Sequence, residues 1–293
     1  MKENTLSKQI FPVLGRAVKE QLFLLICLAA TIFGMIALAV LLYQIIREGA
    51  PRVDLEFLKR PPSRIPEKAG IYPAVVGTLW LMALTAVFTI PVGVSAAIYL
   101  EEFASKNWFT RFVQVNISNL AGVPSIVYGL LGLAIFVRAF SLGESILSGA
   151  LTMSLLLLPL VITASQEAIR AVPSSYREGA LALGATRWEA IRGVVLPSAA
   201  SGIITGVILA LSRAIGEAAP LIAIGAATYI RFAPSSPMDS FTVLPVQIYY
   251  WAQMPREGFR QNAAAAILLL LVVLLLFNSI AIYLRYRARL DKS

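Results

Sequence analysis

Long runs without charge alternate with short polar stretches along this chain, and the pattern predicts helices that span a membrane. The first run, 22–46, contains no charged side chain. It is long enough to cross about 30 Å of hydrocarbon and exceeds the ~7–15 apolar residues of a signal peptide, so we predict an uncleaved first helix. Further apolar runs lie near 71–100, 112–137, 145–165, 198–224 and 263–283. We therefore expect an all-α, polytopic membrane protein with six transmembrane helices.

Composition supports this class and excludes several kinds of site. Hydrophobic residues make up 58% of the chain and charged residues 14%, and the mean hydropathy is +0.77. Histidine is absent, and the single cysteine, Cys27, lies in an apolar run. These counts exclude a disulfide framework, a Cys/His zinc site and histidine-based acid–base catalysis. We expect no catalytic residue and no metal site.

The basic residues border the apolar runs, so the net charge of +9 indicates membrane topology and contacts with membrane lipids, not nucleic acid. Six spans place both termini on one side. That side, with the 101–111 stretch and the central polar stretch, carries 14 Lys and Arg residues, whereas the other side carries 10. The bias predicts a cell (inner) membrane protein with cytoplasmic termini.

The central polar stretch contains the stop and capping signals of two short helices that fold back on each other. Gly184 is expected to stop the first helix in a tight turn. Thr186 and Glu189 have the spacing of a capping box for the second helix, which we expect to run from Trp188 and to end at Leu196-Pro197.

This stretch resembles the EAA loop of ABC importer membrane subunits. The pattern is Glu-x-Ala, three residues, Gly, nine residues, then aliphatic-x-Leu-Pro, with Gly179 and Val194 replacing the usual Ala and Ile. In that family the loop docks on an ATPase subunit. The resemblance implies a coupling loop at 174–197, and the residues it assigns to coupling are Glu178, Gly179, Ala180, Leu183, Gly184, Ala185, Trp188 and Pro197. Leu181, Leu183 and Trp188 would fill a pocket on the partner. The alternative is an ordinary amphipathic loop on the membrane surface.

Two charges inside the fifth run form a candidate substrate path. Arg213 and Glu217 are four residues apart, which places them on one face of a helix. Each costs about 2.5–3.5 kcal/mol at the membrane centre, so both should face protein or a water-filled cavity. Gly216 between them allows a close approach or a kink. A guanidinium suits a phosphate-like oxyanion, but the pair can also be purely structural.

Weaker candidates lie elsewhere in the apolar runs. The segment 121–133, rich in glycine and containing Pro124, predicts a broken or closely packed helix. Its Ser125 and Tyr128 are candidate path residues, although hydroxyls in membrane helices often bond nearby backbone instead. Tyr249, Tyr250 and Trp251 are expected to form an aromatic anchor at the membrane interface.

Four stretches together resemble the PstA family, the permease subunits of phosphate-specific ABC importers. They are 121–133, 167–191, LSRAIGEAAPLIAIGA at 211–226 and FTVLPVQIYYWAQMP at 241–255. The resemblance implies a type I importer (MetI-like) permease fold and a transport role for Arg213 and Glu217. It also implies three partners: a PstC-like subunit, two copies of an ATP-binding subunit, and an external phosphate-binding protein. ATP and Mg would be bound by the ATPase, because this chain has no G-x-x-x-x-G-K-[ST] motif and no cofactor site of its own.

We expect three regions and one main function. The regions are 1–70 with an N-terminal cytoplasmic tail, the first helix and an outer loop, 71–285 as the core permease domain with the coupling loop, and 286–293 as a cytoplasmic tail. The expected function is a permease for inorganic phosphate that is not an enzyme by itself. Alternatives are a permease for molybdate, sulfate or phosphonate, and an ATP-independent channel or carrier. An intramembrane enzyme is disfavoured because the apolar runs lack clustered acidic residues and histidine.

Overall fold

The computed structural model describes residues 4–226 and 229–290, and over these ranges the secondary structure is helical apart from one isolated bridge between Ser145 and Ser240. The first half contains α1 (Asn4–Gly49), η1 (Ala50–Arg52), α2 (Leu55–Lys59), η2 (Pro66–Lys68), α3 (Tyr72–Ile98), η3 (Tyr99–Phe103), α4 (Trp108–Leu120), α5 (Ser125–Gly132) and η4 (Leu133–Ala139). The second half contains α6 (Ile146–Arg170), α7 (Ser174–Ala182), α8 (Arg187–Ala190), η5 (Ile191–Val195), α9 (Leu196–Ile215), α10 (Ala219–Ala223), α11 (Leu244–Gln253) and α12 (Glu257–Leu290).

Five helical stretches are long and apolar enough to cross a membrane, and the number is six if a bent pair of helices counts as one span. The five are Lys19–Arg52, Tyr72–Phe103, Ile146–Arg170, Arg187–Ile215 and Glu257–Ile280. The pair is Trp108–Leu120 with Ser125–Ala139, and its two halves meet at 105°. The all-α, polytopic prediction is confirmed, and the third span is the broken helix that its glycines and Pro124 indicated.

The break in the third span has a local cause. Pro124 precedes α5 in an extended conformation, so its carbonyl begins a new helix instead of continuing α4. The hydroxyl of Tyr128 donates a hydrogen bond of 2.8 Å to the carbonyl of Leu120, the last residue of α4. The same carbonyl also accepts from the amide of Val123 at 3.1 Å, so the bond from Tyr128 ties α5 to the end of α4.

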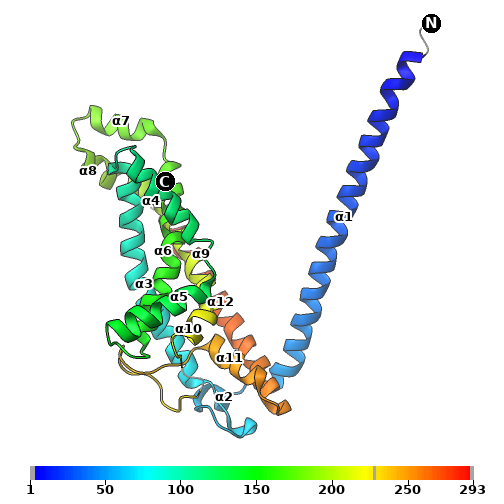
Figure 1. The fold of residues 1–293 in the computed structure, drawn as a ribbon, viewed down its shortest axis with the longest axis vertical. Coiled ribbons are helices and arrows are strands. Elements are labelled where there is room, and N and C mark those ends of the chain that lie inside the picture. Colours follow the sequence, from blue (N-terminus) through cyan, green and yellow to red (C-terminus); the bar gives the residue numbers. More distant parts are fainter. Residues whose placement is uncertain (1–3, 227–228, 291–293) are drawn as a thin grey trace.

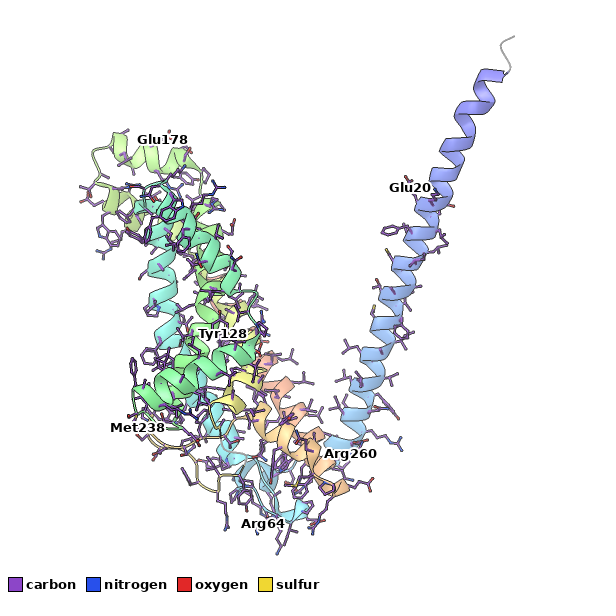
Figure 2. All side chains as sticks on the ribbon, in the orientation of Figure 1. Glu20, Arg64, Tyr128, Glu178, Met238 and Arg260 are labelled. Atoms are coloured by element: carbon purple, nitrogen blue, oxygen red, sulfur yellow. The ribbon has the colours of Figure 1, made fainter. Side chains whose placement is uncertain are left out.

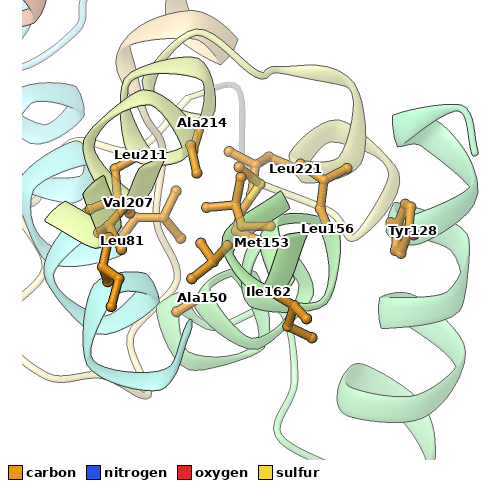
Figure 3. Packing of buried hydrophobic residues seen from close by; sticks show 14 of the residues in the cluster. Leu81, Tyr128, Ala150, Met153, Leu156, Ile162, Val207, Leu211, Ala214 and Leu221 are labelled. Atoms are coloured by element: carbon orange, nitrogen blue, oxygen red, sulfur yellow. The ribbon is translucent and has the colours of Figure 1, made fainter. Parts of the chain in front are cut away.

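Helix α6 is the centre of the bundle, because it packs against both α3 and α9. Leu81 of α3, Met153 of α6 and Val207 of α9 belong to one buried cluster, whose members converge on α6 in Figure 3. Small residues bring the axes close: a Cβ on Gly206 of α9 would lie 2.5 Å from the Cβ of Ala164 of α6. Such pairs of small residues are the usual contact between membrane helices.

The helix ends gather at two opposite ends of the molecule (Figure 1). Helices α7 and α8 lie at the end where α1 starts and α12 finishes, and α2 and α11 lie at the other. We call these the loop end and the α11 end. Helix α1 leans away from the bundle and meets it near Gly49, where an added Cβ would lie 2.6 Å from the backbone of Ala264 in α12.

A second, smaller core lies at the α11 end and corrects the predicted aromatic anchor. Trp251 is 1% exposed, and its ring centroid lies 5.9 Å from that of Phe57 in α2. Trp251 is thus a core residue, because α2 and the start of α12 fold over it, while Tyr249 is half exposed. The anchor prediction was wrong for Trp251.

Two helix boundaries also differ from the sequence-based boundaries. Helix α12 continues to Leu290, so the described part of the predicted tail 286–293 is helical, and residues 291–293 lie outside the described ranges. The expected N-terminal tail is helical from Asn4, and residues 1–3 likewise lie outside them.

Candidate coupling loop and translocation path

The predicted coupling loop is a helix–turn–helix at the loop end. Helix α7 ends at Ala182, and Gly184 turns the chain with a φ of +89°, a left-handed conformation that strains residues with a side chain. The Thr186 hydroxyl accepts a hydrogen bond from the Glu189 amide at 3.3 Å, and the Glu189 carboxylate accepts one from the Thr186 amide at 2.7 Å. The predicted turn and capping box are therefore both present.

The turn places apolar side chains in the open. Leu183 is 92% exposed, and Leu181 and Trp188 are about half exposed. The Trp188 ring also lies 6.4 Å from the ring of Phe103, which closes η3. Of the other predicted coupling residues, those exposed are Glu178, Gly179 and Gly184, and those half-buried are Ala180 and Ala185. Figure 2 shows Glu178 at the tip of this end.

Pro197 does not end the second short helix, as the sequence suggested. The chain stays helical from Arg187 to Ile215, and the turn 191–195 widens to a π-helix just before Pro197. Proline lacks an amide hydrogen and clashes with the carbonyl four residues earlier in a regular helix, and a π turn relieves that conflict. The loop therefore continues into α9 without a flexible joint. Pro197 itself is exposed near the start of α9.

Sequence reasoning missed the residues that fasten the loop to the bundle. The Arg177 guanidinium donates to Oε1 of Glu102 from Nε at 3.0 Å and from Nη2 at 2.8 Å. It also donates to the backbone carbonyls of Val172 and Ile169 at 2.7 and 2.9 Å. The Glu102 side chain is only 8% exposed. This group joins α7 to the end of α3 and the end of α6.

Glu101, the residue before Glu102, is also held by side chains of a neighbouring helix. Glu101 accepts a hydrogen bond from the Gln166 side chain at 3.1 Å and forms an ion pair with Arg170, both on α6. Two successive carboxylates directly after an apolar run were the available signal, since such residues need cationic partners where the chain leaves the membrane. Their partners, 65 or more positions away, gave no local sign.

Arg213 and Glu217 are adjacent in space but do not share a helix. Helix α9 ends at Ile215, Gly216 is its C-cap, and Glu217 lies in the link to α10. The Arg213 Nε nevertheless lies 3.4 Å from Oε1 of Glu217. The Arg213 side chain is 56% exposed and that of Glu217 19% exposed. A half-exposed guanidinium in an apolar span must be covered by another protein chain or by water in the membrane.

The structure brings the two predicted path segments together. A Cβ on Gly129 of α5 would lie 2.6 Å from the carbonyl oxygen of Pro220 in α10, so the two backbones touch. Gly216 makes no such approach; its nearest neighbour would be 3.8 Å away, and its role is to end α9. Ser125 is half-buried at the start of α5, and Tyr128 is buried with its hydroxyl on Leu120. Tyr128 is near the middle of the bundle in Figure 2.

No metal centre accompanies these segments in the part of the chain that the structure describes, since no three His, Cys, Asp or Glu side chains cluster there. The chemistry available is that of hydrogen-bond donors and one partly open cation. Such a set suits the binding of an anion.

Comparison with known proteins agrees with this arrangement. Residues 89–291 match the family described as "Binding-protein-dependent transport system inner membrane component". The phosphate transport system permease protein PstA of Pasteurella multocida is 31% identical over 250 residues, covering 85% of this chain and 88% of that protein. The probable ABC transporter permease protein YqgI of Bacillus subtilis is 35% identical over 222 residues, covering 73% of this chain and 75% of that protein.

Solved structures show the same fold at low identity. A chain of a bacterial alginate ABC transporter superposes with a TM-score of 0.65 at 17% identity, covering 93% of this chain and 96% of that one. A chain of the MetNI methionine ABC transporter in an inward-facing conformation gives a TM-score of 0.59 at 17% identity, covering 74% and 97%. The MetI-like permease fold is thereby confirmed. This multi-pass membrane protein belongs to the family of binding-protein-dependent transport system inner membrane components, in which it groups with the permeases named PstA.

Proposed function

We propose that this chain is the membrane permease subunit of an ATP-driven importer for inorganic phosphate. The likeness to PstA permeases over 85% of the chain carries the substrate assignment. A cation partly open within an apolar span, Arg213, supports it, because a guanidinium donates two parallel hydrogen bonds to a tetrahedral oxyanion. Glu217 holds Arg213 in position, so the anion meets an oriented donor.

The permease works as one half of a path and needs a second membrane subunit of the PstC type. The half-exposed Arg213 supports such a partner, because the guanidinium must be covered or hydrated within the membrane. Ser125 and Tyr128 lie on α5, which touches the link that carries Glu217 through the contact of Gly129 with Pro220. These elements form the path together.

ATP and Mg are bound by a separate ATPase subunit, of which two copies serve the complex. One docks on α7 and α8, where Leu183 offers an exposed apolar contact on a loop without a flexible joint. Arg177 and Glu102 then pass the displacement of the loop to α3 and α6. An extracytoplasmic phosphate-binding protein delivers substrate at the α11 end. This orientation places the loop end, with the start of α1 and the end of α12, in the cytoplasm.

Uptake by the reconstituted complex tests this function. Proteoliposomes that contain the complex and enclosed ATP, with the binding protein outside, are given radiolabelled phosphate, sulfate or molybdate. The proposal expects ATP-dependent accumulation of phosphate with little of the other two. Uptake of sulfate or molybdate in place of phosphate would support the permease role and contradict the assignment of phosphate as the substrate. Equal uptake with and without ATP would indicate a channel or carrier.

A further inference from the structure

A cavity of about 780 Å³ at the α11 end takes no part in the loop or the path described above. It lies between the segment 60–68, which follows α2, and the segment 229–231, which follows α10. Arg64, one of its residues, marks the extreme of this end in Figure 2. Its polar lining consists of Arg60, Ser63, Arg64, Lys68, Tyr229 and Arg231.

The positive charge of the lining is not balanced by any acidic side chain of the lining. It contains three arginines and one lysine but no carboxylate. Arg60 pairs with Glu56 at 2.7 Å, outside the lining, whereas Arg64, Lys68 and Arg231 enter no ion pair within residues 4–226 and 229–290. The cavity of about 770 Å³ at the loop end differs in that its lining contains two carboxylates, Glu101 and Glu102, which pair with Arg170 and Arg177 beside the further cations Lys106, Arg111 and Arg187. Unbalanced charge in a hollow raises the local concentration of anions.

The backbone of the segment that carries Arg64 and Lys68 is held in place by hydrogen bonds. Arg52 donates hydrogen bonds to the carbonyls of Pro66, Glu67 and Ala69 at 3.0, 2.8 and 3.1 Å. Asn262 of α12, which is fully buried, accepts from Arg52 Nε at 2.8 Å and donates to the Pro66 carbonyl at 2.9 Å. A rigid backbone loses little conformational freedom on binding, so Arg64 and Lys68 are carried on a wall that does not have to reorganise.

We propose that this cavity is a binding site for a tetrahedral oxyanion of the phosphate class. Arg64 and Arg231 supply guanidinium donors, Lys68 supplies an ammonium, and the hydroxyls of Ser63 and Tyr229 complete the donor set. The ligand is free inorganic phosphate or the phosphodiester of a lipid headgroup, which present the same oxygens. Resting on the proposed function, the site gathers the transported anion at the face where the binding protein releases it.

Direct binding without ATP or binding protein tests the site. The complex is placed in nanodiscs of phosphatidylcholine, and binding of radiolabelled inorganic phosphate is measured by equilibrium dialysis at low ionic strength. The Arg64→Gln/Lys68→Gln double variant should bind phosphate about a hundredfold more weakly, since it removes two cationic donors and each lost charge-assisted hydrogen bond weakens binding about tenfold or more. Lys59→Gln is the matched control, because Lys59 is exposed on α2 and does not line the cavity. Equal weakening in both variants would overturn the site.

A second arm identifies the source of the phosphate group. Native mass spectrometry of the complex from membranes containing phosphatidylglycerol should show this lipid retained by wild type and lost from the double variant, if the occupant is a headgroup. If neither phosphate nor phosphatidylglycerol distinguishes the double variant from Lys59→Gln, the inference is wrong. If the double variant loses only the ATP hydrolysis that the binding protein stimulates, the cavity contacts an acidic protein surface and not a phosphate group. That result would also overturn the site.

The two proposals fail separately. A wild-type complex that binds phosphate here but imports none would reject the proposed function and leave the site standing. A complex that imports phosphate with unchanged binding in the double variant would do the opposite. Thermal unfolding of each variant, measured in the same nanodiscs, shows whether the fold is retained.

Discussion

The guanidinium of Arg177 in α7 donates two hydrogen bonds, of 3.0 and 2.8 Å, to a single carboxylate oxygen of Glu102 in η3, the turn that continues α3. The remaining donors of Arg177 reach the carbonyls of Ile169 and Val172, where α6 ends. Three elements thus share one side chain. A force applied to α7 reaches two membrane helices through this contact, because Glu102 is nearly buried and cannot swing freely.

Glu102→Gln should weaken both the fold and the coupling. Breaking a buried ion pair costs about 3–5 kcal/mol, and a smaller loss of about 2 kcal/mol is expected here because the Arg177 side chain is 25% exposed and glutamine keeps an acceptor. The measurements are thermal unfolding of the purified complex and phosphate imported per ATP hydrolysed. Glu167→Gln is the control, since its carboxylate is 71% exposed and pairs with Arg170 at the surface. Equal effects of the two substitutions would contradict the coupling role of Glu102.

Gly184→Ala should strain the turn without creating any clash. The φ of +89° is left-handed, and a Cβ at Gly184 would meet nothing within 4 Å, so the effect is purely conformational, about 1–2 kcal/mol. We expect lower affinity for the ATPase subunit, measured by titration of the detergent-purified membrane subunits. Gly34→Ala is the matched control, because Gly34 lies inside α1, outside the predicted coupling residues, with nothing within 4 Å, and alanine favours a helix by about 0.5–1 kcal/mol. An unchanged affinity for Gly184→Ala would show that the turn is not needed for docking.

Gly129→Ala should push α5 away from α10. The new methyl group would lie 2.6 Å from the Pro220 carbonyl, a backbone atom that cannot rotate away, and overpacking of this kind costs about 1–3 kcal/mol. The displaced link carries Glu217, so phosphate uptake should fall along with the unfolding temperature. Gly122→Ala, whose nearest contact would be 3.4 Å, should leave uptake nearly unchanged. The reverse order of effects would contradict the assignment of α5 and α10 to the path.

The turn 235–239 at the α11 end should open at acidic pH. The Asp239 carboxylate accepts hydrogen bonds from the amides of Ser235 and Ser236 at 2.8 and 2.9 Å, and these bonds hold its pKa below the usual value. A lowered pKa in the folded state stabilises the turn above the unfolded-state pKa of about 3.9, and this contribution disappears as the pH falls through the folded value.

Hydrogen exchange reports this opening, because the carbonyls of Asp239 and Pro237 accept from the amides of Ile146 and Leu147 at the start of α6. Protection of these two amides should drop below about pH 4 in wild type. In Asp239→Asn it should be lower at neutral pH and no longer change with pH. Protection that stays constant in wild type between pH 6 and pH 3 would exclude the turn as its source.

The sequence predicted local features well, because their causes are local. The Thr186–Glu189 capping box and the turn at Gly184 depend on residues within one turn of each other, and both are present. The lengths of the apolar runs predicted the spans for the same reason. The predicted end of the second short helix at Pro197 was wrong, because a π turn accommodates a proline that a regular helix would not.

Features that depend on distant partners were not predictable from one sequence. Glu102 and Arg177 are separated by 75 positions, so neither reveals the other. Tryptophan is a residue type that often anchors a helix at the membrane interface, but Trp251 is buried because α2 packs over it. The spacing of Arg213 and Glu217 indicated proximity correctly for a different reason, since Gly216 ends the helix between them and the link, not a helical face, brings Glu217 back to Arg213.

The most direct test of the account measures phosphate uptake and ATP hydrolysis in the same proteoliposomes for wild type, Arg213→Lys and Arg213→Gln. We expect ATP-dependent uptake by wild type, reduced uptake with Arg213→Lys, which keeps the charge but not the paired donors, and almost none with Arg213→Gln. Hydrolysis should continue in all three, because Arg213 lies in the last turn of α9, at the end of that helix away from the loop on which we propose that the ATPase docks. Uptake by Arg213→Gln at the wild-type rate would contradict the account, for it would make the Arg213–Glu217 pair structural and place the anion path elsewhere.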